Sequence, residues 1–128
     1  MARWPGAGRC KRRLATDMAE QLDLSSSRER SARLQRQLCC HTLNVAREEQ
    51  NRGRISPVLA VSGLGPRAAH RWGKQQGILR VRRQGDGCLG TLLKRQLLQE
   101  QRWRRPTLVV GTDLPDLSHQ DLHSALTR

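Results

Sequence analysis

An aspartate near the C-terminus lies where a strand is expected to end. Residues 107–111 (Thr-Leu-Val-Val-Gly) have the clearest strand pattern in the chain, and Asp113 follows them in a turn that also contains Asp116. Carboxylate and phosphate oxygens are preferred ligands of Mg²⁺ and Mn²⁺, so an aspartate here can hold such a cation against a diphosphate. Aspartates also shape turns through local hydrogen bonds, which is the structural alternative.

A basic cluster near the N-terminus could bind the phosphates of the same ligand. Arg9, Lys11, Arg12 and Arg13 lie in or beside a loop with two glycines. Their cationic groups can hold polyphosphate oxygens through charge and bidentate hydrogen bonds, although a solvated basic surface is the alternative. We therefore expect Asp113 to face residues 9–13 across a shared cleft.

A glycine-rich loop offers a second type of nucleotide site. Residues 85–90 (Gly-Asp-Gly-Cys-Leu-Gly) match the G-x-G-x-x-G pattern, follow a possible strand and open a helix, and Asp113 comes about twenty residues later. Residues 79–84 are too charged for the buried central strand of a dinucleotide fold. Binding of NAD(P) through residues 85–90 is therefore kept as an alternative.

The histidines and cysteines form no recognisable site. His119 and His123 are four residues apart but lack a nearby third ligand, and we interpret all the histidines as surface residues. The four cysteines include no C-x-x-C pair, so we interpret them as reduced thiols. No catalytic residue can be assigned.

Composition limits the class of protein. The 128 residues suit one domain, and the net charge of +13 favours phosphate-bearing partners. No run approaches the roughly 18 apolar residues of a membrane span, and a signal peptide is absent, so we expect a cytoplasmic protein without a membrane partner. A basic, non-catalytic nucleic-acid-binding protein is a further alternative, although the chain has no aromatic stacking platform.

The elements that must position these residues alternate between helix and strand. We expect strands at 57–62, 78–81 and 107–111. We expect a long helix from an N-cap among Ser25, Ser26 and Ser27 to residue 51, and further helices at 67–72, at 89–103 and from a capping box at 118–121. This order predicts an α/β fold of three layers, with a mostly parallel sheet and helices on both faces. Ligands of such sheets bind beyond the carboxyl ends of the strands, here after Val61, Val81 and Val110.

Several segments, in order, resemble one bacterial family of glycosyltransferase-A-like proteins, the radical-SAM/selenodomain-associated transferases. The segments are A-R-W-P-G-A-G-R-C-K-R-R-L, R-L-Q-R-Q-L-C-C-H-T-L, Q-G-D-G-C-L-G-T-L-L and L-V-V-G-T-D-L-P-D-L-S. The resemblance implies a nucleotide-diphosphosugar transferase-like fold and a metal-dependent transferase that uses a nucleotide-sugar donor. It also implies nucleotide-binding roles for Lys11, Arg13, Gln84, Gly85, Gly87 and Gly90, and a metal-binding role for Asp113.

The chain departs from the family pattern in ways that bear on activity. Arg12 stands where the family usually has Thr, and Cys88 where it usually has Asp, which removes a carboxylate from the middle loop. The family's first strand is expected before Ala2, and its C-terminal half after Arg128. We therefore expect residues 1–128 to form a single partial glycosyltransferase-A-like domain, and a domain truncated in this way need not be active.

Overall fold

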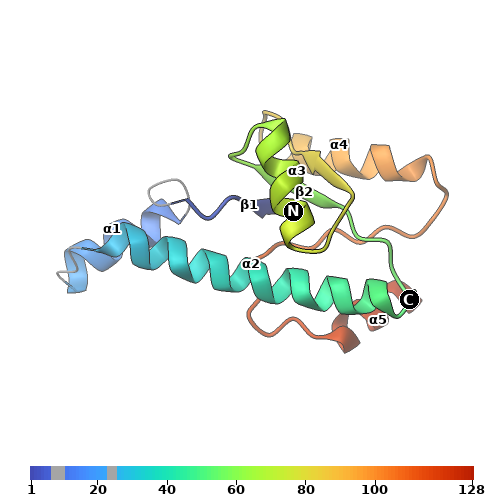
Figure 1. Ribbon diagram of the computed structural model, residues 1–128, viewed down its shortest axis with the longest axis horizontal. Helices are drawn as coiled ribbons and strands as arrows, with labels where there is room; N and C mark the ends of the chain where they lie inside the picture. Colours follow the sequence, from blue (N-terminus) through green and yellow to red (C-terminus); the bar gives the residue numbers. More distant parts are fainter. Residues whose placement is uncertain (7–10, 23–25) are drawn as a thin grey trace.

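The computed structural model describes residues 1–6, 11–22 and 26–128, drawn in Figure 1. Within these residues the chain forms, in order, β1 (Ala2–Arg3), α1 (Arg12–Leu22), α2 (Ser27–Asn51), β2 (Leu59–Ser62), α3 (Pro66–Gln75), β3 (Val81–Arg83), α4 (Leu89–Gln101) and α5 (His119–Thr127). The α/β class predicted from the sequence is therefore confirmed.

Strand β2 is the centre of a small, open parallel sheet. The strand order is β1-β2-β3, with Ala2 of β1 opposite Val61 and Val81 of β3 opposite Leu59. Leu59, Ala60 and Val61 are all buried, as expected for a strand covered on both faces. The strand predicted at 57–62 is confirmed.

One face of the sheet carries the apolar core. Leu59 and Val61 point to the same face because side chains alternate along a strand. Their cluster includes Cys39 and Leu43 of α2 and Ala69 and Trp72 of α3, together with Ala2 and Ile78. Helices α2 and α3 therefore lie on the same face, as crossovers of one hand between successive neighbouring strands require.

The opposite face of the sheet is polar and is covered by α4. Ala60 lies opposite Arg82 of β3 on this face, and the Arg82 guanidinium pairs with the Glu100 carboxylate of α4. This contact places α4 against the face of the sheet opposite to α2 and α3. Ala60 and Arg82 offer little apolar surface on this face for the leucines of α4 to contact. The helix predicted at 89–103 forms, but Leu89 and Leu98 on it are 67% and 51% exposed.

Two strand predictions are wrong. The third sheet strand is at Val81–Arg83 rather than 78–81, and Ile78 is instead buried in the core. Residues 107–111 form no strand, although the amino group of Met1 donates a hydrogen bond to the Val110 carbonyl. The segment thus runs beside β1, but β1 has only two residues to offer as ladder partners, so an apolar run alone did not suffice. Strand β1, at Ala2–Arg3, was not predicted either, since the first strand was expected before Ala2.

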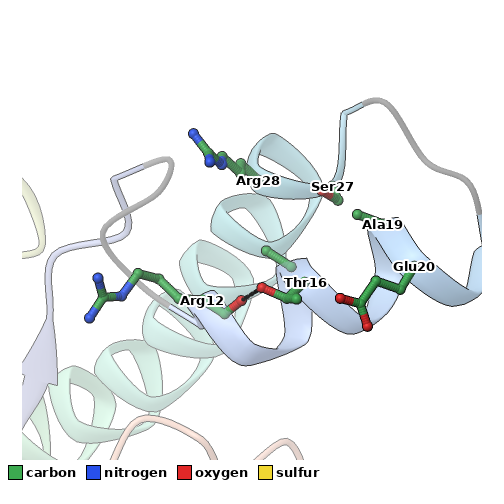
Figure 2. A pocket seen from close by; sticks show the side chains of 7 residues that line it. Arg12, Thr16, Ala19, Glu20, Ser27 and Arg28 are labelled. Atoms are coloured by element: carbon green, nitrogen blue, oxygen red, sulfur yellow. Dashed lines mark hydrogen bonds between the residues drawn. The ribbon is translucent and has the colours of Figure 1, made fainter.

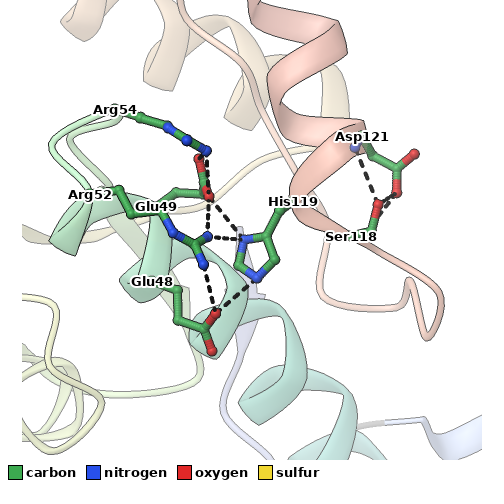
Figure 3. Close-up of polar contacts among 7 residues, drawn as sticks. All are labelled: Glu48, Glu49, Arg52, Arg54, Ser118, His119 and Asp121. Atoms are coloured by element: carbon green, nitrogen blue, oxygen red, sulfur yellow. Dashed lines mark hydrogen bonds and ion pairs between the residues drawn. The ribbon is translucent and has the colours of Figure 1, made fainter.

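Helix α5 is attached to the C-terminal part of α2 by polar contacts. The capping box predicted at Ser118 and Asp121 is confirmed at the start of α5. Before it, a ring nitrogen of His41 on α2 lies 2.9 Å from the Leu117 carbonyl oxygen. His119 is the first residue of α5, and its ring contacts the carboxylates of Glu48 and Glu49, at 2.9 and 3.0 Å (Figure 3).

Glu49 is the buried centre of this ion cluster. Its side chain is 2% exposed, and Arg52 and Arg54 donate to its carboxylate at 2.7 and 3.4 Å (Figure 3). The Arg52 hydrogen bond, with help from Arg54, lowers the pKa of Glu49 against the opposing effect of its burial. The ionised carboxylate is therefore the form that the fold stabilises.

Within the part of the chain that the structure describes, no helix combines the length and the apolar character that crossing a bilayer would need.

We predict that Glu49→Gln lowers the melting temperature by several degrees, because it leaves two arginines and a histidine without their shared carboxylate. A carboxyl group whose pKa is lower in the folded state stabilises the fold above its ordinary pKa, near 4.5, and loses this effect as the pH falls through the lowered value. The wild type should therefore lose stability more steeply than Glu49→Gln in acid. Thermal melts between about pH 3 and 7 measure both effects.

Glu48→Gln is the matched control, because Glu48 is the neighbouring residue and its side chain is 52% exposed. An exposed ion pair contributes little, so this variant should melt close to the wild type. Equal losses in the two variants would contradict a central role for Glu49.

Candidate functional site

The structure brings together Lys11, from the basic cluster, and Asp113, which were expected to face each other across a cleft. The Lys11 ammonium nitrogen lies 3.1 Å from an oxygen of the Asp113 carboxylate. The Lys11 side chain is 21% exposed and that of Asp113 is 66% exposed, so the pair is open to solvent. Lys11 directly precedes α1, and Asp113 follows the segment beside β1. This pair is the candidate site.

Buried polar contacts place Asp113 at the carboxyl edge of the sheet. The Thr112 hydroxyl is buried and accepts a hydrogen bond from the Gln35 amide of α2, at 3.4 Å. That amide also contacts the Cys39 thiol, which lies near the Arg3 carbonyl at the end of β1. Val110 lies beside Met1, and Thr112 is linked to Arg3 through Gln35 and Cys39, so residues 110–113 run in the direction of β1 and end at the same edge.

Lys11 is held in an unusual backbone conformation. Its φ angle is 44°, in the left-handed region that residues with a side chain rarely adopt. Its carbonyl accepts a hydrogen bond from the Ala15 amide and so begins α1. A residue in this region needs surrounding contacts to hold it, and the ion pair with Asp113 is one of them.

The site offers one carboxylate to a cation. Among the described residues there is no group of three or more histidine, cysteine, aspartate or glutamate side chains that could hold a metal ion. A single exposed carboxylate suits Mg²⁺ or Mn²⁺ that also takes oxygens from a bound diphosphate and from water. The residues present therefore fit a cation shared with a ligand and do not form a cage for a resident metal.

The glycine-rich loop is positioned by contacts inside the protein. Gln84 is buried, and its amide nitrogen donates to the carbonyls of Ala2 in β1 and Ala60 in β2, both at 2.9 Å. Arg95 of α4 donates to the Gln84 carbonyl at 2.7 Å. Gly85 has a φ of 78°, which favours glycine, and a Cβ atom there would lie 2.3 Å from an Arg95 nitrogen, so the Arg95 side chain would have to move. Gln84 and Gly85 thus support the loop from within.

The rest of this loop leads into α4. Gly87 has a φ of 129°, which favours glycine, and Gly90 lies in the first turn of the helix with open space around it. Cys88 precedes the helix, and its thiol lies 3.3 Å from the Thr91 hydroxyl. The Thr91 hydroxyl, followed by backbone amides of the first turn, lowers the pKa of the exposed Cys88 thiol.

Among the described basic candidates, Arg12 and Arg13 form no ion pair with Asp113. Arg9 lies outside the described residues. Arg13 lines a shallow hollow on α1 with Arg12, Thr16 and Asp17, and within the described residues it forms no ion pair with Asp113. A neighbouring hollow of about 410 Å³ lies between α1 and α2 (Figure 2). The side chains of Arg12 and Arg28 extend away from Thr16 there, and neither Lys11 nor Asp113 lines it.

Sequence reasoning missed the residues that support the site. Gln35 lies on the face of α2 that also contains Ala32 and Cys39, both buried, so a polar residue in an apolar stripe was the available signal. Arg95 gave no such signal, because a basic residue on a helix usually points to solvent. The three described cysteines, Cys39, Cys40 and Cys88, are free thiols, as predicted.

We predict that Gln84→Leu lowers the free energy of unfolding by about 2 kcal/mol, because it removes two hydrogen bonds that a buried amide donates. Gln99→Leu is the control, since Gln99 is exposed on α4, and it should change stability by less than about 0.5 kcal/mol. Urea denaturation measures both variants. If Gln84→Leu were as stable as the control, the bridging role of its amide would be disproved.

A model of a known protein family matches part of this chain. The family model described as "Uncharacterized protein conserved in bacteria (DUF2064)" matches residues 42–128, from the second half of α2 to the end of α5. The match includes the loop at Gln84 and Asp113, and Lys11 lies outside it. No curated protein and no solved structure matches the chain significantly. The chain therefore belongs to this family of uncharacterised proteins conserved in bacteria.

Proposed function

We propose that the carboxyl edge of the sheet binds the diphosphate of a nucleotide sugar, and that the domain is of the glycosyltransferase-A-like, nucleotide-diphosphosugar transferase type. The observation that carries the proposal is the contact of 3.1 Å between Lys11 and Asp113. It joins a cation and a carboxylate from distant parts of the sequence at the edge where ligands of parallel sheets bind. The ordered motifs that resemble this type of transferase are a second support.

Each residue of the pair has a separate task in this function. The Lys11 ammonium would donate to phosphate oxygens and balance part of their charge. Asp113 would hold Mg²⁺ or Mn²⁺ jointly with the diphosphate, and the cation would supply stabilisation of a diphosphate leaving group. Arg13 and Arg9 would add positive charge, and the loop of Gln84, Gly85, Gly87 and Gly90 would border the same edge.

Two other functions are less well supported. Dinucleotide binding through residues 85–90 would need a central strand before the loop, whereas β3 is an edge strand of the sheet and Arg95 fills the space beside Gly85. Nucleic-acid binding has one favourable observation, the exposed arginines Arg30, Arg33 and Arg36 along α2. Binding of single-stranded RNA that weakens steeply with salt would support it.

We predict that the wild type binds uridine or guanosine diphosphate more tightly with Mn²⁺ than without it, and that Asp113→Ala loses this gain. Because a charge-assisted contact is lost, the affinity in Mn²⁺ should fall about tenfold or more. Isothermal titration calorimetry measures the affinities, and circular dichroism verifies that the variant is folded.

Asp116→Ala is the matched control, because Asp116 is an exposed aspartate in the same turn and forms no ion pair within the described residues. It should bind like the wild type. Equal binding by the wild type and Asp113→Ala would remove the role of Asp113. Failure of both diphosphates to bind, together with salt-sensitive RNA binding, would favour the nucleic-acid function instead.

A further inference from the structure

We propose that Lys11 and Asp113 block each other in the free protein, so that a diphosphate must separate them before a divalent cation can bind. This inference rests on the proposed function and adds an order to it. The anion binds first, and the cation enters with it or after it. In the free protein, Lys11 takes the place of the cation at Asp113, and Asp113 takes the place of a phosphate at Lys11.

A divalent cation meets competition at Asp113 in the free protein. The position that a cation would take at the contacted Asp113 oxygen is occupied by the Lys11 ammonium group, 3.1 Å away. Two positive charges at one carboxylate oxygen repel each other. Among the described residues, no group of three metal-ligating side chains is present to offset that repulsion. The free protein should therefore bind Mg²⁺ or Mn²⁺ very weakly.

A phosphate anion also meets competition from the ion pair. Asp113 competes with any phosphate for the Lys11 ammonium, and its own negative charge repels the phosphate. Asp113 is exposed and Lys11 is partly exposed, so exchanging one partner for another costs little. Once a diphosphate takes Lys11, the carboxylate is released beside bound phosphate oxygens, and together they provide the oxygen ligands that Mg²⁺ prefers.

Variants of Asp113 should change the affinity for a diphosphate differently with and without a cation. Without a cation, Asp113 weakens the binding of a diphosphate, whereas with a cation it strengthens that binding. Removing its charge should therefore raise the affinity in one buffer and lower it in the other. A residue that merely supports the fold would not produce opposite effects in the two conditions.

The test uses inorganic pyrophosphate and isothermal titration calorimetry, once in EDTA and once in Mg²⁺, with the full chain. In EDTA, Asp113→Asn should bind pyrophosphate about threefold more tightly than the wild type, since a competing ion pair is removed. In Mg²⁺ the order should reverse, with the wild type binding about tenfold more tightly. Lys11→Gln should bind more weakly than the wild type in both buffers.

Asp116→Asn removes the same charge three residues away and should match the wild type in both buffers. If Asp113→Asn binds pyrophosphate no more tightly than the wild type in EDTA, the inference fails, while the proposed function stands as long as Mg²⁺ still strengthens wild-type binding. If the wild type binds no pyrophosphate in either buffer, the proposed function fails as well. Thermal melts of each variant verify folding.

Discussion

The buried strand β2 supports every layer of this small domain. Its backbone pairs with β1 on one side and β3 on the other. Leu59 and Val61 anchor α2 and α3 on one face, and Ala60 lies on the face covered by α4. A sheet with such short strands has few ladder hydrogen bonds, so side chains must add links between strands. The Gln84 amide does this by joining the carbonyls of Ala2 and Ala60.

The two faces of the sheet use different interactions, and this difference shapes the surface. The face towards α2 and α3 is apolar and includes the perpendicular rings of Trp4 and Trp72, whose centres are 5.2 Å apart. The face towards α4 relies on the pairing of Arg82 with Glu100. Ion pairs help to hold α4, and none of its leucines is fully buried: Leu92 and Leu93 are half-buried, and Leu89 and Leu98 are exposed.

The candidate site arises because parallel strands end at one edge. The chain after β1, the loop after β3 and the segment 110–113 all arrive there, although they are far apart in the sequence. Contacts beneath the edge hold each of them: Gln35 contacts Thr112, and Arg95 contacts the carbonyl of Gln84. The exposed pair of Lys11 and Asp113 is thus carried on buried polar supports.

Local patterns in the sequence were sufficient for the elements whose stability is local. The apolar run of β2, the capping box of α5 and the helix α4 were predicted because hydrophobic periodicity and caps act within a few residues. Residues 107–111 have the same apolar character, but a strand exists only if a neighbour pairs with its backbone, and β1 is too short to do so. The ion cluster at Glu49 and the contact of Lys11 with Asp113 also depend on distant partners. Residue type and spacing suggested that a cation and a carboxylate could meet. The packing of α2 against the end of β1 determines where Asp113 lies. This packing is a property of the tertiary structure, because the burial of Thr112 and Gln35 depends on the assembled fold.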